Sequence, residues 1–221
     1  MRQIDFYFDP ISPYAYLAFH ALPSALQGHS VSIRYKPILF AALLQANGQK
    51  GPAEIPGKRD WTYRQVLWLA KQQGVAMALP TAHPFNPLAL LRVLLSGADA
   101  SGCVNRYLAE LALNHVWQSG GDPVDSQRLS ALSAAIESHC AARGTEIATP
   151  DAAKQQLRDN TDEALDRGVF GVPTACLDGL SFWGLDGLPM LRGYLDDPSW
   201  YLSDAYQKVG ELPIGVKRQT A

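Results

Sequence analysis

Cysteine is scarce in this sequence of 221 residues: only Cys103, Cys140 and Cys176 occur, and no two of them form a C-x-x-C pair. An odd number of widely spaced cysteines does not provide a disulfide framework, and it lacks the paired spacing of a zinc site. We therefore expect reduced thiols, no metal site and a cytoplasmic location.

Long basic runs and long apolar runs are also missing. The 19 basic and 21 acidic residues give a formal charge of −2, and no Lys/Arg cluster offers the patch that nucleic-acid phosphates require. The first ten residues contain Asp5 and Asp9 and no apolar stretch typical of a signal peptide. No segment approaches the roughly 18 apolar residues that would span a bilayer. We expect neither nucleic-acid nor membrane partners for this globular composition.

The beginning of the chain has the pattern of a β-α-β unit. Residues Gln3–Phe8 alternate as in a short strand. Ser12 followed by Pro13 is typical of an N-cap with proline at the first helical position. Apolar and small residues continue the helix over Tyr14–Leu26, and Val31–Tyr35 alternates as a second strand. A right-handed crossover is expected for such a unit.

The middle of the chain, from about residue 60 to 148, has apolar residues at helical spacing and no strand candidate. It is expected to form an all-helical insertion domain. The predicted helices cover Trp61–Gln73, Pro87–Leu95, Cys103–Gln118 and Ser126–Ala142.

The last part of the chain returns to mixed structure. A helix is predicted after the Thr149 cap, then a β-hairpin around Asp178-Gly179, then a helix over about Asp186–Leu195. The whole order predicts an α/β chain with a thioredoxin-like fold. Its discontinuous thioredoxin-like domain would cover residues 1–59 and 149–203, with a C-terminal tail over 204–221.

The turn before the first helix is the first candidate for chemistry. Unpaired N–H groups and the helix dipole favour an anion at a helix N-terminus, and redox enzymes use this to activate the first cysteine of C-x-x-C. Ser12 and Ala15 occupy the two cysteine positions here, so the turn cannot form a disulfide. The Ser12 hydroxyl can instead donate a hydrogen bond to an external thiolate, or it can serve only as the helix cap.

The second candidate is the segment Gly171-Val172-Pro173-Thr174, which lies between a helix and the hairpin. A thioredoxin-like fold places a cis-proline there, and we predict that Pro173 follows a cis bond. The Val172 backbone would then face the Ser12 turn and pair with an extended peptide such as glutathione.

Together, F-D-P-I-S-P-Y-A-Y-L-A (8–18), H-P-F-N-P-L (83–88), R-G-V-F-G-V-P-T (167–174) and F-W-G-L-D (182–186) resemble the 2-hydroxychromene-2-carboxylate isomerases. These enzymes are relatives of the kappa-class glutathione transferases within the DsbA-like group. The resemblance extends over nearly the whole chain. It implies a cytoplasmic homodimer that binds glutathione and a small aromatic carboxylate substrate.

The resemblance also implies roles for single residues. Ser12 would activate the glutathione sulfur. The glutathione contacts would be Asn47, Lys58, Val172, Pro173 and Asp186, and the substrate contacts would be Phe85, Asn86, Tyr14 and Trp61. The sequence departs from the relatives beside Asp186, because Leu185 replaces a serine of the transferases and Gly187 replaces an arginine of many isomerases.

Most of these residues have a second interpretation. Asn47-Gly48 is a common turn pair, Lys58 can be a solvated lysine, and Asp186 can cap its helix. Asn86-Pro87 suits an N-cap and first helical position, and the aromatic residues can belong to the core. The five histidines form no Ser–His–Asp signature, and no catalytic histidine is assigned.

The implied reaction interconverts 2-hydroxychromene-2-carboxylate and trans-o-hydroxybenzylidenepyruvate in aromatic hydrocarbon degradation. Addition and loss of a thiolate would permit rotation about a conjugated C=C bond, which is nucleophilic catalysis by a cofactor. The alternatives are a kappa-type glutathione transferase or peroxidase, and a non-catalytic peptide-binding thioredoxin-fold module.

Overall fold

The computed structural model describes residues 1–216 and begins with the predicted β-α-β unit. Strand β1 (Arg2–Phe8) and strand β2 (Val31–Pro37) are joined by helix α1 (Pro13–Ala25). The two strands are parallel neighbours over their full length, and a parallel pair requires a crossover connection such as this helix. The predicted unit is confirmed, and it places the start of α1 at the carboxyl end of β1.

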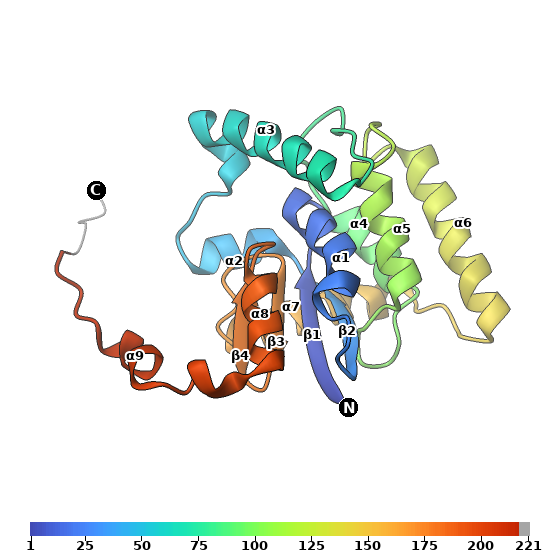
Figure 1. The fold of residues 1–221 in the computed structure, drawn as a ribbon. Helices are drawn as coiled ribbons and strands as arrows, with labels where there is room; N and C mark the ends of the chain where they lie inside the picture. The colour runs from blue at the N-terminus through green and yellow to red at the C-terminus, as the bar shows by residue number, and fades with distance from the viewer. Residues whose placement is uncertain (217–221) are drawn as a thin grey trace.

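One mixed sheet in the order β2-β1-β3-β4 forms the centre of residues 1–216 (Figure 1). Strand β3 (Thr174–Leu177) runs antiparallel to β1, and strand β4 (Leu180–Trp183) runs antiparallel to β3. The turn residues Asp178 and Gly179 have positive φ angles of 52° and 80°, as a type I′ turn requires. The predicted hairpin is therefore confirmed.

Different helices cover the two faces of the sheet. The side chains of Ile4, Phe6 and Phe8 in β1 belong to a cluster with residues of α1 and α8 (Gly187–Asp196). Tyr7, on the other face, packs against Ala164 of α7 (Pro150–Asp166). This division follows from the alternation of side chains along a strand. The α/β class is confirmed.

The insertion forms the four predicted helices, with some different ends. Helix α3 begins at Pro56 rather than Trp61, because proline suits the first turn. Helix α5 begins after Asn105, whose side chain accepts from the Leu108 N–H. Val104 pairs with Tyr35 in an isolated β-bridge, but no strand forms between residues 60 and 148, as expected. The helices are α3 (Pro56–Gln73), α4 (Leu88–Leu95), α5 (Arg106–Trp117) and α6 (Ser126–Arg143).

Several short segments have no counterpart in the sequence-based prediction, because one or two turns are too short to show a clear hydrophobic period. They are α2 (Phe40–Ala46), α9 (Asp204–Gln207) and the 3-10 helices Pro52–Glu54, Pro198–Trp200 and Lys208–Glu211.

Beyond α8 the chain extends away from the sheet (Figure 1), and residues 202–216 are exposed. The part of the predicted tail over 217–221 lies outside the described residues. No helix within residues 1–216 has the length and apolar character needed to cross a membrane.

A continuous hydrophobic cluster joins the sheet to the insertion. It contains Phe6 of β1 and Phe19 of α1 together with Leu90, Leu113 and Trp117 of the insertion, each at most 1% exposed. The predicted division of the chain at residues 59/60 and 148/149 stays a prediction. The core itself continues across that division.

Candidate active site

Ser12 lies at the N-terminus of α1 and is 6% exposed. Its Oγ accepts a hydrogen bond from the Ala15 N–H at 3.2 Å and donates one to the Val172 carbonyl at 3.3 Å. The cap interpretation is confirmed. The same geometry holds the hydroxyl where the positive end of the helix dipole favours an anion.

The Val172–Pro173 peptide bond is cis, as predicted. Because the Val172 carbonyl accepts from Ser12 Oγ, the prediction that this backbone faces the Ser12 turn is also confirmed. Within residues 1–216 the Val172 N–H has no hydrogen-bond acceptor. One donor beside Ser12 therefore remains available for an extended peptide.

A cavity of about 1,320 Å³ surrounds Ser12. It lies between helix α1, the segment after β2, helix α3, the segment 83–87, the segment 170–172 and helix α8. Such a volume exceeds the usual range for a small-molecule site, about 300–1,000 Å³. The predicted residues that line it are Ser12, Tyr14, Lys58, Phe85, Val172 and Asp186.

Four predicted site residues do not line this cavity. The side-chain amide of Asn47 donates to the Leu43 carbonyl at the end of α2, at 2.8 Å, as a helix-end residue does. Trp61 is 64% exposed on α3. Asn86 accepts from the Leu88 N–H at 3.1 Å and so satisfies one free donor of the first turn of α4, although Pro87 holds the N-cap position. Pro173 also lies outside the lining, directly after Val172.

Charged groups of both signs line the cavity. Lys58 stands in the first turn of α3, and Asp186 precedes α8 without making a capping hydrogen bond. Asp186 therefore occupies the N-cap position of α8 but does not cap the helix through its side chain. Among residues 1–216 neither Lys58 nor Asp186 takes part in an ion pair, so both charges can face a ligand.

Gly187 follows Asp186 where the backbone leaves no room for a side chain. A Cβ atom at this position would lie 2.9 Å from the carbonyl carbon of Phe182. An arginine there, as in many isomerases, would require the backbone to move. The neighbouring departure, Leu185, adds an apolar side chain to the cavity lining.

Asp9 is a fully buried carboxyl group in the cavity wall, and no sequence pattern indicates its role. Its two oxygens accept from the N–H groups of Ile11 and Phe40, each at 3.0 Å. Burial raises the pKa of Asp9 to about 7, against the lowering effect of these two donors. Asp9 thus ties the Ser12 turn to the start of α2.

Two side chains of the insertion hold the carbonyl groups of the same turn. The indole N–H of Trp117 donates to the Pro10 carbonyl at 2.7 Å, and His83 Nε2 lies 2.8 Å from the Ile11 carbonyl. The segment H-P-F-N-P-L belongs to the resemblance, yet the sequence predicts no role for His83. Its partner lies 72 positions away in the sequence, and such a contact leaves no local pattern.

Aromatic side chains surround the open parts of the cavity. The Tyr14 hydroxyl donates to Gln65 Oε1 at 2.6 Å and so joins α1 to α3. Burial raises the pKa of Tyr14, and the Asp186 charge raises it further. Phe170 and Trp183 stack edge to face with ring centres 5.0 Å apart and are 42% and 52% exposed. Helix α3 and the segment 83–87 supply one wall.

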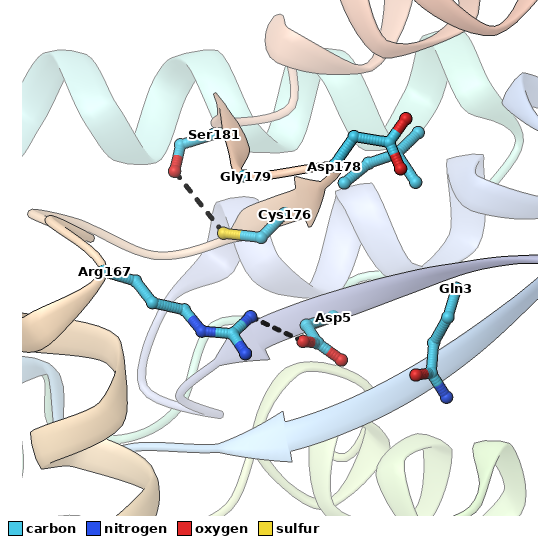
Figure 2. A pocket seen from close by; sticks show the side chains of 8 residues that line it. Gln3, Asp5, Arg167, Cys176, Asp178, Gly179 and Ser181 are labelled. Atoms are coloured by element: carbon cyan, nitrogen blue, oxygen red, sulfur yellow. Dashed lines mark hydrogen bonds and ion pairs between the residues drawn. The ribbon is translucent and has the colours of Figure 1, made fainter.

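A second, smaller cavity of about 300 Å³ lies beside the β3–β4 turn (Figure 2). Its charged side chains and its thiol already have partners. Arg167 pairs with Asp5 at 2.7 Å, and the Cys176 thiol lies 3.4 Å from Ser181 Oγ. Burial raises the pKa of the Cys176 thiol, which opposes a nucleophilic role. The larger cavity is therefore the candidate active site.

Comparison with known proteins identifies the family to which this chain belongs. The family model of the DSBA-like thioredoxin domain matches residues 3–196. A 2-hydroxychromene-2-carboxylate isomerase from a Pseudomonas species (strain C18) is 31% identical over 193 residues, or 86% of this chain and 88% of the relative. The chain belongs to the DsbA-like 2-hydroxychromene-2-carboxylate isomerase family.

Two further relatives, an isomerase and a kappa-class transferase, match most of the chain. A solved structure of a 2-hydroxychromene-2-carboxylate isomerase superimposes with a TM-score of 0.68 at 27% identity, covering 91% of this chain and 100% of the other. Glutathione S-transferase kappa 2 of Caenorhabditis elegans is 28% identical over 213 residues, 89% of this chain and 93% of its own length. These relatives are enzymes, and the match over most of the chain identifies this protein as an enzyme with isomerase relatives.

Proposed function

We propose that this protein is a glutathione-dependent isomerase that interconverts 2-hydroxychromene-2-carboxylate and trans-o-hydroxybenzylidenepyruvate. The observation that carries the proposal is the Ser12 hydroxyl at the start of α1, 3.3 Å from the Val172 carbonyl and inside a cavity of about 1,320 Å³. Ala15 stands where the redox relatives have their second cysteine. The site can polarise an external sulfur without forming a disulfide.

The residues present fit glutathione. A peptide with two carboxylates and one amino group needs charges of both signs, and Lys58 and Asp186 supply them without competing ion pairs among the described residues. The free N–H of Val172 supports pairing with the cysteinyl backbone. Asn47, which makes a helix-end hydrogen bond, would need a different rotamer to take part.

When bound, glutathione would supply a thiolate, whose addition to a conjugated C=C bond would permit rotation and whose expulsion would restore the conjugation. Only a few per cent of a free thiol with a pKa of about 8.5 is ionised at pH 7. The Ser12 hydroxyl can turn about its Cβ–Oγ bond from the Val172 carbonyl toward the sulfur. The N–H groups at the start of α1 favour the same negative charge. Apolar lining residues such as Phe85 and Leu185 exclude water from the aromatic part of the substrate.

Lys58 and Lys50 are the cationic candidates for carboxylate groups, because both line the cavity. Glutathione carries two carboxylates and the aromatic substrate carries one, so each lysine can serve one carboxylate of a different ligand. We also propose a cytoplasmic location, which the three free and buried cysteines support.

We propose a homodimer as well. The side chains of Trp61 and Trp68 on α3 are 64% and 59% exposed, which supports a contact surface on that helix. Sedimentation of the purified protein tests the dimer.

A kappa-type transferase or peroxidase is the second candidate, favoured by the match to the kappa 2 relative. The two activities differ in the fate of the thiol. An isomerase returns glutathione unchanged, whereas a transferase or peroxidase consumes it. A peptide-binding module without catalysis would bind glutathione and convert nothing.

The test follows the ultraviolet spectrum of hydroxychromene carboxylate with purified protein under three conditions: no thiol, glutathione, and S-methylglutathione. We expect conversion only with glutathione, and thiol titration at the end should recover all of it. Full conversion without a thiol would refute the role of glutathione. Loss of thiol in proportion to product would establish the transferase instead.

A further inference from the structure

The peptide group between Ile11 and Ser12 is held at both of its polar atoms. Its oxygen lies 2.8 Å from His83 Nε2, and its N–H donates to the Asp9 carbonyl at 2.9 Å. Because a peptide group is planar, two such hydrogen bonds fix the rotation of the plane. That rotation sets the direction of the Ser12 Cα–Cβ bond and therefore the position of the hydroxyl oxygen.

The contact to Ile11 requires a particular tautomer of His83. A carbonyl oxygen only accepts, so His83 Nε2 must carry the proton. The other ring nitrogen, Nδ1, lies 2.7 Å from the Tyr63 hydroxyl, which is nearer than the second possible acceptor of that hydroxyl, the His83 carbonyl at 3.2 Å. In the neutral ring Nδ1 accepts from Tyr63, and this hydrogen bond keeps the ring proton on Nε2.

The surroundings of the Tyr63–His83 pair favour this arrangement. Burial lowers the pKa of His83 against the raising effect of the Ile11 carbonyl, and the nearby Arg59 charge lowers it further, so the ring is neutral at pH 7. Burial also raises the pKa of Tyr63, which keeps its proton. The Arg59 guanidinium lies 5.0 Å from the centre of the Tyr63 ring and donates to the His83 carbonyl.

We infer that Tyr63 and His83 are positioning residues, which hold the Ser12 hydroxyl by fixing the His83 proton on Nε2 and, through it, the Ile11–Ser12 peptide plane. The inference rests on the proposed function, because it concerns how Ser12 meets the glutathione sulfur. Neither side chain needs to touch the reacting atoms. Both belong to the helical insertion, so the insertion contributes to catalysis through the turn as well as through the cavity wall.

The first test reads the tautomer directly and needs no substrate. Nitrogen-15 NMR of the imidazole rings, with the His83 signals assigned from the His83→Gln variant, should show the Nε2–H form in the wild type. Tyr63→Phe removes the proton that fixes this form and should produce a share of the Nδ1–H form. Tyr107→Phe is the control, because Tyr107 stacks on His139 with centres 4.5 Å apart, at an exposed site.

The second test measures kcat, KM for glutathione and the ultraviolet absorbance of the bound thiolate. Tyr63→Phe should lower kcat by about two- to tenfold, the effect of one neutral hydrogen bond, and reduce the thiolate absorbance with KM unchanged. His83→Leu should lower kcat further. His83→Gln should recover part of the loss, because its amide can donate to Ile11 and accept from Tyr63. Tyr107→Phe should match the wild type.

Three outcomes would overturn the inference. The first is an Nδ1–H form of His83 in the wild type. The second is a kcat and a thiolate absorbance equal to those of the wild type in both Tyr63→Phe and His83→Leu. The third is a lower melting temperature of these two variants with unchanged kcat per folded molecule. A wild type without glutathione-dependent turnover would overturn the proposed function. The NMR result would still decide the tautomer in that case.

Discussion

Ser12 has two roles to separate at the scale of the single residue. Its Oγ caps α1 through the Ala15 N–H and also meets the Val172 carbonyl. Capping contributes about 1 kcal/mol to stability, whereas a hydrogen bond to a thiolate acts on the sulfur. Stability and thiolate ionisation therefore report on different roles of the same oxygen.

Replacement of Ser12 by alanine should raise the pKa of the bound glutathione thiol and lower turnover most strongly near neutral pH. A hydrogen bond to a charged group contributes about 1.5–3 kcal/mol, so the expected loss of turnover lies between about tenfold and a hundredfold. A pH–rate profile with thermal melts measures both effects. Thr149→Ala is the matched control, because Thr149 caps α7 through the Ala152 N–H and does not line the cavity. Equal activities of the two variants would leave Ser12 as a cap alone.

Asp9 gives a prediction on pH and stability. Its pKa is about 7 in the native state, above the value of about 3.9 in an unfolded chain. Between these values the unfolded chain has released a proton that the native protein retains, so the free energy of unfolding should fall as pH rises through this range. The fall stops above about pH 7, where both states are ionised.

Urea unfolding of the wild type and Asp9→Asn at several pH values checks this behaviour. The wild type should lose stability relative to Asp9→Asn as pH rises from about 4 to about 7. The comparison removes the opposite contributions of Asp5 and Glu163, whose pKa values are lowered in the native state. A difference that does not change with pH would mean that the Ile11 and Phe40 donors keep Asp9 ionised throughout.

At the scale of the element, two neighbouring residues in the segment before α4 have different expected roles, one in capping the helix and one in contacting the substrate. Asn86 accepts from the Leu88 N–H, while its neighbour Phe85 lines the cavity. Asn86→Ala should therefore lower stability by about 1 kcal/mol and leave turnover unchanged. Phe85→Leu should change KM for the aromatic substrate with α4 still capped. Loss of turnover in Asn86→Ala at an unchanged melting temperature would contradict the capping role and support the predicted substrate contact.

At the scale of the whole molecule, the continuous core predicts that the sheet and the insertion unfold together. Leu113 of α5 is fully buried in the cluster that also contains Phe6 of β1. Leu113→Ala should lower the stability of the whole chain by about 2–5 kcal/mol and shift one cooperative transition seen by calorimetry and circular dichroism. The exposed Leu202 serves as control, since its replacement by alanine should change stability by no more than about 0.5 kcal/mol. Two separate transitions would instead support the predicted two-domain division.

The sequence by itself determined the local features of this protein. The β-α-β unit, the Ser12 cap, the D-G hairpin and the insertion helices each depend on residues a few positions apart, and their order determined the fold class. Serine and alanine at the two cysteine positions likewise exclude redox exchange on chemical grounds alone. These features follow from hydrophobic periods, caps and turns, which are local in the chain.

Tertiary structure alone decided which side chains reach the site. Trp61 belongs to a helix that the sequence predicts, yet its side chain does not line the cavity, because the rotation of a helix about its axis depends on its packing partners. His83 and Trp117 contact the Ser12 turn across 72 and 107 positions of sequence. The pKa of Asp9 is raised by burial that only the assembled core provides. Contacts between distant segments leave no periodic signal in the sequence, so the positioning of Ser12 emerges only when the insertion packs against the sheet.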